Sequence, residues 1–175
     1  LDPGKVYLGS PKGLFLFEEA DSPAGAIRQL TGSNGLPPGP ASSIFVSDNG
    51  RILFCGMAGK GVYKSVDGGE RWESLYADKA LDRLFVNPWN QNYLAIAYGG
   101  SADRRYPRFS TDGGKTFAEP SSIEKRPGYT GDLFLVYGLS HAAYHPQDGQ
   151  LFFVGRQTNI GRAQSFYRSD DGGST

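Results

Sequence analysis

A short motif that occurs three times constrains the fold of this chain more than any other feature. It reads VYKSVDGGERW at 62–72, RFSTDGGKTF at 108–117 and FYRSDDGGST at 166–175. Its serine recurs after 45 residues and then after 59 residues. Repeats of this length are typical of β-propellers, in which each repeat is a blade made of a four-stranded antiparallel sheet.

A second repeat precedes each copy of the motif and consists of an apolar run, a polar turn and another apolar run. It reads SIFVSDNGRILFCG from Ser43, RLFVNPWNQNYLAIA from Arg83 and AAYHPQDGQLFFVG from Ala142. Turns rich in Asn, Asp, Pro and Gly reverse a strand, so each copy predicts a β-hairpin. The N-terminal KVYLGSPKGLFLF matches the second half of this unit, with Gly9 aligned with Gly56.

The composition agrees with an all-β chain. It includes 25 Gly, 11 Pro, 13% aromatic residues and a single Met, which suits short strands and tight turns better than long helices. We expect about 14 short antiparallel strands in one β-propeller segment of three to four blades. The expected blades are 1–35, incomplete; 43–76; 82–119; and 139–175, incomplete. An inner strand of the first blade and an outer strand of the last are missing, which predicts an open arc of a larger propeller.

The motif S-x-D-x-G-x-T-[WF] resembles the Asp-box, or BNR repeat, of sialidases. The same box is found in xyloglucanase-type glycoside hydrolases, sortilin-like receptors and photosystem assembly factors. The first copy departs from it with Arg71 where threonine is usual, and the second has Phe117 where tryptophan is usual. The resemblance implies an Asp-box β-propeller whose boxes lie on the face opposite the active site.

The residues of the boxes themselves favour a structural role. Short carboxylates accept backbone N–H bonds across a turn, paired glycines supply positive φ angles, and the closing aromatic residue is expected to pack between blades. A carboxylate that recurs in three blades is explained more simply by the same role in each of them than by one catalytic or calcium site. We assign this structural role to Ser65, Asp67, Gly69, Trp72, Ser110, Asp112, Gly114, Phe117, Ser169, Asp171 and Gly173.

The irregular parts of the repeat are the loops expected on the other face. The long ones are 31–42, 99–105, 119–139 and 156–164. Long loops in a compact domain are usually functional, and arginine binds a carboxylate through two hydrogen bonds. The sequence therefore predicts a site for an acidic sugar or an acidic protein loop. The candidate ligand-binding residues are Arg104, Arg105, Tyr106, Arg126, Arg156 and Arg162.

A catalytic function requires a defined set of side chains and not only a polar face. Glycosidases use two carboxyl groups at a fixed separation, or, in sialidases, a tyrosine nucleophile with a carboxylate partner. Spacing singles out no such set, so the catalytic residues are unknown, and the [FY]-R-I-P signature that opens sialidase domains is absent. Two functions therefore stay open: a recognition or assembly module, and part of a sialidase-like or xyloglucanase-like hydrolase. The candidates for the second are Asp103, Glu124, Tyr129 and Asp132.

The net charge and a few single residues limit the remaining classes of function and of binding site. Lys plus Arg and Asp plus Glu are 18 each, which argues against a nucleic-acid surface, and no apolar run is long enough for membrane insertion. We expect Cys55 to be a buried apolar residue. We expect His141 and His145 to lie on a strand and a turn, where their spacing does not form a metal-binding pair. We expect no cofactor and no metal. The expected partners are a glycan or a protein and the remaining blades, in an extracytoplasmic location.

Trp89 in the turn NPWNQN has two alternative roles. It is either an exposed platform on which a sugar ring stacks or an anchor packed against the neighbouring blade. The sequence favours the anchor.

Overall fold

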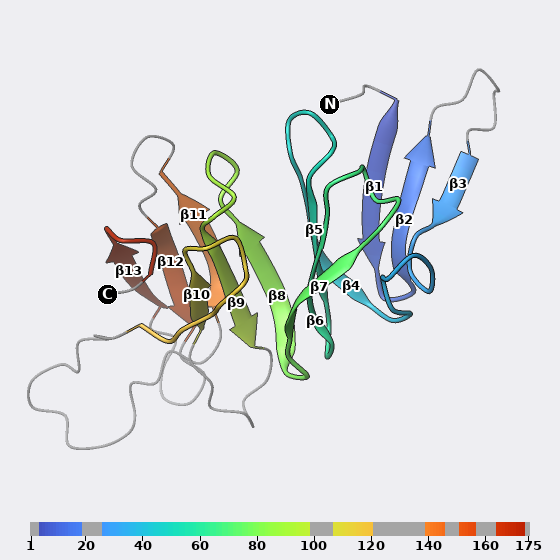
Figure 1. Ribbon diagram of the computed structural model, residues 1–175. Helices are drawn as coiled ribbons and strands as arrows, with labels where there is room; N and C mark the ends of the chain where they lie inside the picture. Colours follow the sequence, from blue (N-terminus) through green and yellow to red (C-terminus); the bar gives the residue numbers. More distant parts are fainter. Residues whose placement is uncertain are drawn as a thin grey trace, which may run out of the picture. The chain divides into compact units, whose positions relative to one another are not determined.

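The computed structural model describes residues 4–18, 26–98, 107–120, 139–145, 151–156 and 164–173. Every regular element in this part of the chain is a β-strand (Figure 1). No helix among these residues is long and apolar enough to cross a membrane. The strands are β1 (Lys5–Ser10), β2 (Gly13–Glu18), β3 (Ala26–Gln29), β4 (Ala41–Val46), β5 (Leu53–Met57), β6 (Gly61–Ser65), β7 (Glu73–Ala77), β8 (Leu81–Val86), β9 (Leu94–Tyr98), β10 (Arg108–Ser110), β11 (Leu139–Tyr144), β12 (Leu151–Arg156) and β13 (Gln164–Ser169).

The strands form four antiparallel sheets in which sequence neighbours pair. The first sheet is β1-β2-β3, the second β4-β5-β6-β7, the third β8-β9-β10 and the fourth β11-β12-β13. This is the strand order of propeller blades. The chain forms two compact units, Leu1–Leu84 and Phe85–Thr175, and β8 crosses from one to the other.

The third sheet differs from the expectation of about 14 strands in four-stranded blades. The fourth strand expected at its end is reduced to one bridge, between Phe109 and Ala118. The two residues exchange backbone hydrogen bonds of 2.8 and 2.9 Å. Pro120 follows two residues later and has no N–H to donate, which ends the pairing.

The core of the N-terminal unit lies between the first and second sheets. Leu14 and Leu16 of β2 pack there with Leu53, Cys55 and Met57 of β5. The other face of β5 is covered as well, since a Cβ added at Gly56 would lie 3.0 Å from the Leu84 Cβ. Because β5 is buried on both faces, its sequence is a continuous apolar run rather than an alternation.

Trp72, the residue just before β7, joins this core. Its side chain is 7% exposed, its indole N–H donates to the carbonyl of Gly69 at 3.0 Å, and its backbone N–H donates to the carbonyl of Asn34 at 2.8 Å. Gly35 has a φ of +91°, and a Cβ there would lie 2.2 Å from the Trp72 carbonyl oxygen. The part of loop 31–42 around Gly35 is therefore built against Trp72 and requires glycine.

Cys55 is the free thiol of the core. It is fully buried, with its Sγ 3.6 Å from the Sδ of Met57, and burial raises its pKa to about 12. Because the thiolate is the reactive form, we expect no modification of the folded chain by a thiol reagent at pH 8 and full modification in denaturant. Stoichiometric labelling of the folded chain within minutes would contradict this.

Candidate functional site

The three copies of the repeated motif, which we call boxes, share one hydrogen-bond pattern. In each, a buried serine hydroxyl donates to Oδ1 of the aspartate two residues later, over 2.8 Å in all three copies. The same hydroxyl oxygen accepts the N–H of the second glycine, over 2.9, 2.9 and 2.7 Å. Serine, aspartate and glycine are Ser65, Asp67 and Gly69; Ser110, Asp112 and Gly114; and Ser169, Asp171 and Gly173.

The backbone of the boxes is equally regular. The first glycine of each pair has φ between 73° and 77°, and the second between 89° and 96°. In the first two boxes the aspartate Oδ1 also accepts a backbone N–H from four residues on, that of Arg71 or Thr116, each over 3.0 Å. These carboxylates therefore bond within their own loops.

The aspartate of the second box accepts one side-chain hydrogen bond that the aspartate of the first box lacks. The Thr116 hydroxyl donates to Oδ2 of Asp112 over 2.6 Å, whereas the first box has Arg71 at this position. Burial acts to raise the pKa of Asp112, but hydrogen bonds from Thr116 and Ser110 lower it to about 2. The pKa of Asp67 is lowered by the N–H of Arg71 and the hydroxyl of Ser65.

This low pKa predicts an acid-sensitive contribution to stability. The Asp112 carboxylate stabilises the fold fully above its ordinary pKa of 3.8, and the stabilisation is lost as the pH falls toward about 2. We expect the difference in free energy of unfolding between the natural chain and Asp112→Asn to shrink over this range. Urea unfolding at pH 5, 4, 3 and 2 measures it. A difference that stays constant with pH would contradict the prediction.

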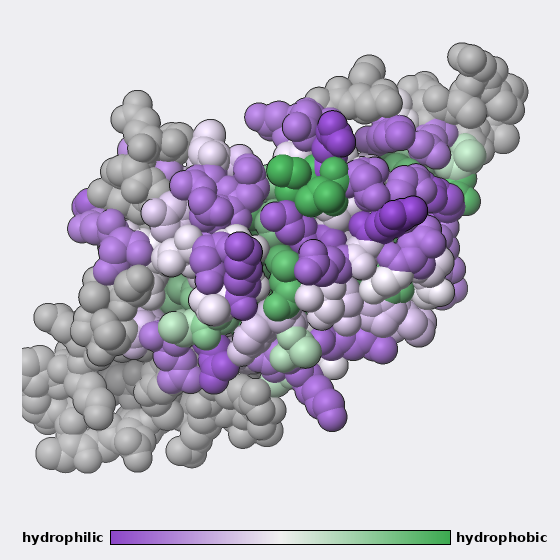
Figure 2. Space-filling model, viewed as in Figure 1, coloured by the Kyte–Doolittle hydropathy of each residue, from purple (hydrophilic) through white to green (hydrophobic). Residues whose placement is uncertain are grey.

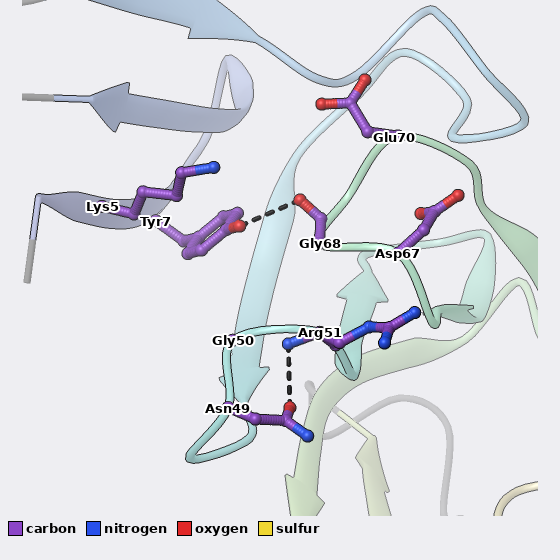
Figure 3. Close-up of a pocket in the computed structure, with 8 residues that line it drawn as sticks. All are labelled: Lys5, Tyr7, Asn49, Gly50, Arg51, Asp67, Gly68 and Glu70. Carbon is purple, nitrogen blue, oxygen red and sulfur yellow. Dashed lines mark hydrogen bonds between the residues drawn. The ribbon is translucent and has the colours of Figure 1, made fainter. Parts of the chain in front are cut away.

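A cavity of about 340 Å³ lies beside the first box, within the N-terminal unit (Figure 3). Three segments far apart in the sequence build it: β1, the turn between β4 and β5, and the box loop after β6. We call it the box cavity. It is lined by Lys5, Tyr7, Asn49, Gly50, Arg51, Asp67, Gly68 and Glu70.

Hydrogen bonds tie the walls of the box cavity together. The Tyr7 hydroxyl donates to the carbonyl of Gly68 over 2.9 Å, and burial raises the pKa of this hydroxyl (Figure 3). The N–H of Gly68 donates to the carbonyl of Arg51 over 2.9 Å, and the N–H of Arg51 donates to Oδ1 of Asn49 over 3.0 Å. These hydrogen bonds thus link β1, the turn between β4 and β5, and the first box loop to one another.

The charged groups around the box cavity are largely paired. Glu70 binds Arg28 of β3 through two hydrogen bonds of 2.6 and 3.2 Å, and Arg28 lowers its pKa. Lys5 forms an ion pair with Glu18 over 3.0 Å. A general acid at neutral pH needs a raised pKa, so neither Asp67 nor Glu70 fits that role. The arrangement is suited to holding two sheets together.

Most residues predicted for the ligand and catalytic sites lie outside the described residues. Of Arg156, the structure gives only its place, at the end of β12 and opposite Gln164 of β13. Among the described residues no group of three or more His, Cys, Asp or Glu side chains is placed to hold a metal ion. Outside the described part lie Asp103, Arg104, Arg105, Tyr106, Glu124, Arg126, Tyr129, Asp132 and Arg162.

The strands nevertheless show where the long segments leave the sheets. β9 ends at Tyr98 and its antiparallel neighbour β10 begins at Arg108, so the intervening segment leaves from one end of the third sheet. The segment between β12 and β13 and the one before Leu139 leave the fourth sheet from the corresponding end. The boxes follow β10 and β13 at the opposite end. We call the two ends of each sheet the loop end and the box end.

Sequence reasoning missed the box cavity and misjudged Trp89. The cavity combines residues of β1, of the turn between β4 and β5 and of the loop after β6, which no local sequence pattern connects. Trp89 is 57% exposed, so its role as a packed anchor is wrong. Asn87 takes the buried place in this turn, and its Oδ1 accepts the N–H groups of Trp89 and Asn90 over 2.9 and 3.0 Å.

Comparison with known proteins bears on the fold. No protein-family model and no curated protein matches the sequence. Among solved structures the chain is similar to an ancestral GH74 enzyme, with a TM-score of 0.61 and 14% identity over 99% of this chain and 22% of that one. It is also similar to the GH74 enzyme of Niastella koreensis, with a TM-score of 0.60 and 18% identity over 98% of this chain and 27% of that one.

The chain has the β-propeller fold. The prediction of an all-β propeller segment is thereby confirmed. The described residues form one four-stranded and three three-stranded sheets. The chain spans about a quarter of the length of the two GH74 enzymes.

Proposed function

We propose that this chain is an Asp-box propeller module that recognises an acidic glycan through the loop ends of its third and fourth sheets. The observation that carries the proposal is the likeness of nearly the whole chain to two GH74 enzymes, where GH denotes glycoside hydrolase. The same proposal includes further blades that complete the propeller and an extracytoplasmic location. A protein with an acidic loop is the alternative ligand.

The chemistry of the box end supports placing the ligand at the other end. The carboxylates of Asp67 and Asp112 accept hydrogen bonds from their own loops, and Glu70 is paired with Arg28. These groups are already used to hold the loops and sheets. The segments at the loop ends are where the repeat departs most from regular length, and they carry the arginines that would bind a carboxylate.

A glycan array followed by calorimetry tests the proposal. We expect binding of acidic glycans by the natural chain and at least tenfold weaker binding by the double variant Arg105→Ala, Arg156→Ala. The matched control is Arg71→Ala, which removes an exposed arginine at the box end. Absence of glycan binding would overturn the proposal, and a loss of binding in Arg51→Ala would move the site to the box cavity.

The likeness to GH74 enzymes also favours a second candidate, part of a glycoside hydrolase. Hydrolysis with retention or inversion requires two carboxyl groups on either side of the scissile bond. Asp103, Glu124 and Asp132 are the candidates, with Tyr129 as the alternative nucleophile. Release of reducing sugar that is lost in Asp103→Asn or Asp132→Asn, and retained in Asp170→Asn, would favour the enzyme. Binding without turnover would favour the recognition module.

A further inference from the structure

Trp89 lies in an exposed turn of the third sheet. The turn joins β8 to β9 at the box end, and it projects past the ends of both strands in Figure 1. The indole ring is 57% exposed, and its N–H makes no hydrogen bond within the part of the chain that the structure describes. In contrast, Trp72 is 7% exposed and its indole N–H donates to the carbonyl of Gly69. The core therefore does not explain the presence of Trp89.

The other repeats have no aromatic residue in this turn. The three corresponding turns read SDNGR at 47–51, NPWNQN at 87–92 and HPQDG at 145–149. Ser47 and Asn87 occupy the same buried place, and the backbone N–H of each donates across its turn over 2.9 Å. A side chain that the blade itself required would recur in the repeat, as the box residues do. Trp89 does not recur, so its role is specific to the third sheet.

Further blades of the propeller do not account for the exposure of this ring. Consecutive blades of a propeller lie side by side around the axis. Blades that precede or follow this chain would therefore adjoin its first or its fourth sheet, whereas Trp89 belongs to the third. The indole ring is thus available to a ligand that is not part of the propeller.

Hydrogen bonds hold the backbone of the turn in one conformation. The Oδ1 of the fully buried Asn87 accepts the N–H groups of Trp89 and Asn90. Pro88 has a fixed φ angle, and its carbonyl accepts the Nε2 amide of Gln91 over 2.9 Å. A backbone that is ordered before binding loses less entropy when a ligand binds, so the turn is suited to present the indole ring.

Amide side chains follow Trp89 in the turn, and residues 87–93 carry no charged side chain. Asn90 and Asn92 are exposed, and Gln91 is half-buried. The Oδ1 of Asn90 accepts the N–H of Asn92 over 3.1 Å, which leaves its Nδ2 to donate to a ligand. Amide groups offer both donors and acceptors, as hydroxyl groups require. A nucleic acid or an anionic membrane would instead be bound through Lys and Arg.

We propose that Trp89 is a stacking platform for a neutral β-linked glycan chain at the box end of the third sheet. A sugar ring has C–H groups on its faces and hydroxyl groups around its edge, so an indole ring and neutral amides on one turn match both parts. An extended β-linked chain can lie across an open ring without a cavity around it. The ligand is uncharged and the site lies at the opposite end of the sheet from the loops, so this inference goes beyond the proposed function and does not depend on it.

Quenching of tryptophan fluorescence by acrylamide tests the proposal on the natural chain. Of the two tryptophans, Trp89 is the exposed one and Trp72 lies in the core. Stacking covers one face of the ring, so we expect saturating cellohexaose or mannohexaose to lower the quenching of Trp89 by about half. Hexagalacturonate, an acidic glycan of the same length, is expected to give no protection, which separates this site from the acidic-glycan site. Absence of protection by both neutral glycans, or protection by hexagalacturonate or hexaproline alone, would overturn the proposal.

Affinity electrophoresis in gels that contain hydroxyethylcellulose, a neutral β-glucan, tests the role of the ring. We expect the gel to retard the natural chain and Trp89→Ala to bind about tenfold more weakly, whereas Trp89→Tyr keeps a ring and retains most of the binding. The matched control Val66→Ala truncates another exposed apolar side chain, 60% exposed in the first box loop, and is expected to bind like the natural chain. Circular dichroism shows whether each variant is folded. A folded Trp89→Ala variant that is retarded like the natural chain would overturn the proposal.

Discussion

Replacing Trp72 by alanine is expected to lower the free energy of unfolding by about 3–5 kcal/mol. The indole ring fills the core between the first and second sheets, so its removal leaves a cavity lined by leucines. It also leaves the carbonyl of Gly69 without the indole N–H that donates to it. Chemical denaturation followed by circular dichroism measures the loss.

The chain supplies its own matched control for this experiment. Trp89 is the other tryptophan, and it is 57% exposed in the turn between β8 and β9. We expect Trp89→Ala to change the free energy of unfolding by less than about 0.5 kcal/mol. Equal losses in the two variants would show that Trp72 does not fill the core.

Replacing Asp112 by alanine is expected to cost about 1–3 kcal/mol of stability. The carboxylate accepts the Ser110 hydroxyl, the Thr116 N–H and the Thr116 hydroxyl, and alanine leaves all three donors without it. We expect Asp67→Ala to cost less, because the first box has no threonine hydroxyl to leave unpaired. Urea unfolding of both variants shows which one loses more free energy of unfolding.

The control for the box variants is an aspartate next to a box carboxylate. Asp170 precedes Asp171 and pairs with Arg168 at the surface, with its own side chain 68% exposed. Surface ion pairs contribute little, so we expect Asp170→Ala to cost less than about 1 kcal/mol. Glycan binding by folded Asp112→Ala is expected to match that of the natural chain. Unchanged stability with lost binding would instead make the box a ligand site.

The sheets were predictable because the information for them is local. Each box carries serine, aspartate and paired glycines within five residues, and the turn before β5 carries Asn49 and Gly50 in the same way. The fourth strand of the third sheet was predicted wrongly because Phe117 and Ala118 look like strand residues, whereas Pro120 ends the pairing. Trp89 was predicted wrongly since its burial depends on which residue of the turn faces the sheet, and that residue is Asn87.

The box cavity was not predictable in the same way. Tyr7 and Gly68 meet across 61 positions of sequence, and Arg28 and Glu70 across 42. Such contacts depend on how one sheet packs on the next, and hydrophobic periodicity reports only which face of a strand is apolar.

The hydrogen bonds of the boxes join residues that are close in sequence, which affects the kinetics of folding. The bonds among Ser65, Asp67, Gly69 and Arg71 span at most four residues, and β5 and β6 are joined by a turn of three. Contacts so close in sequence form with little loss of loop entropy, so each hairpin and its box can assemble before the sheets dock. We therefore expect the slow step to be the meeting of sheets through Trp72 and its neighbours. In that order of events each repeat is a folding nucleus, and the folded region extends as neighbouring repeats dock onto it, as in solenoid proteins.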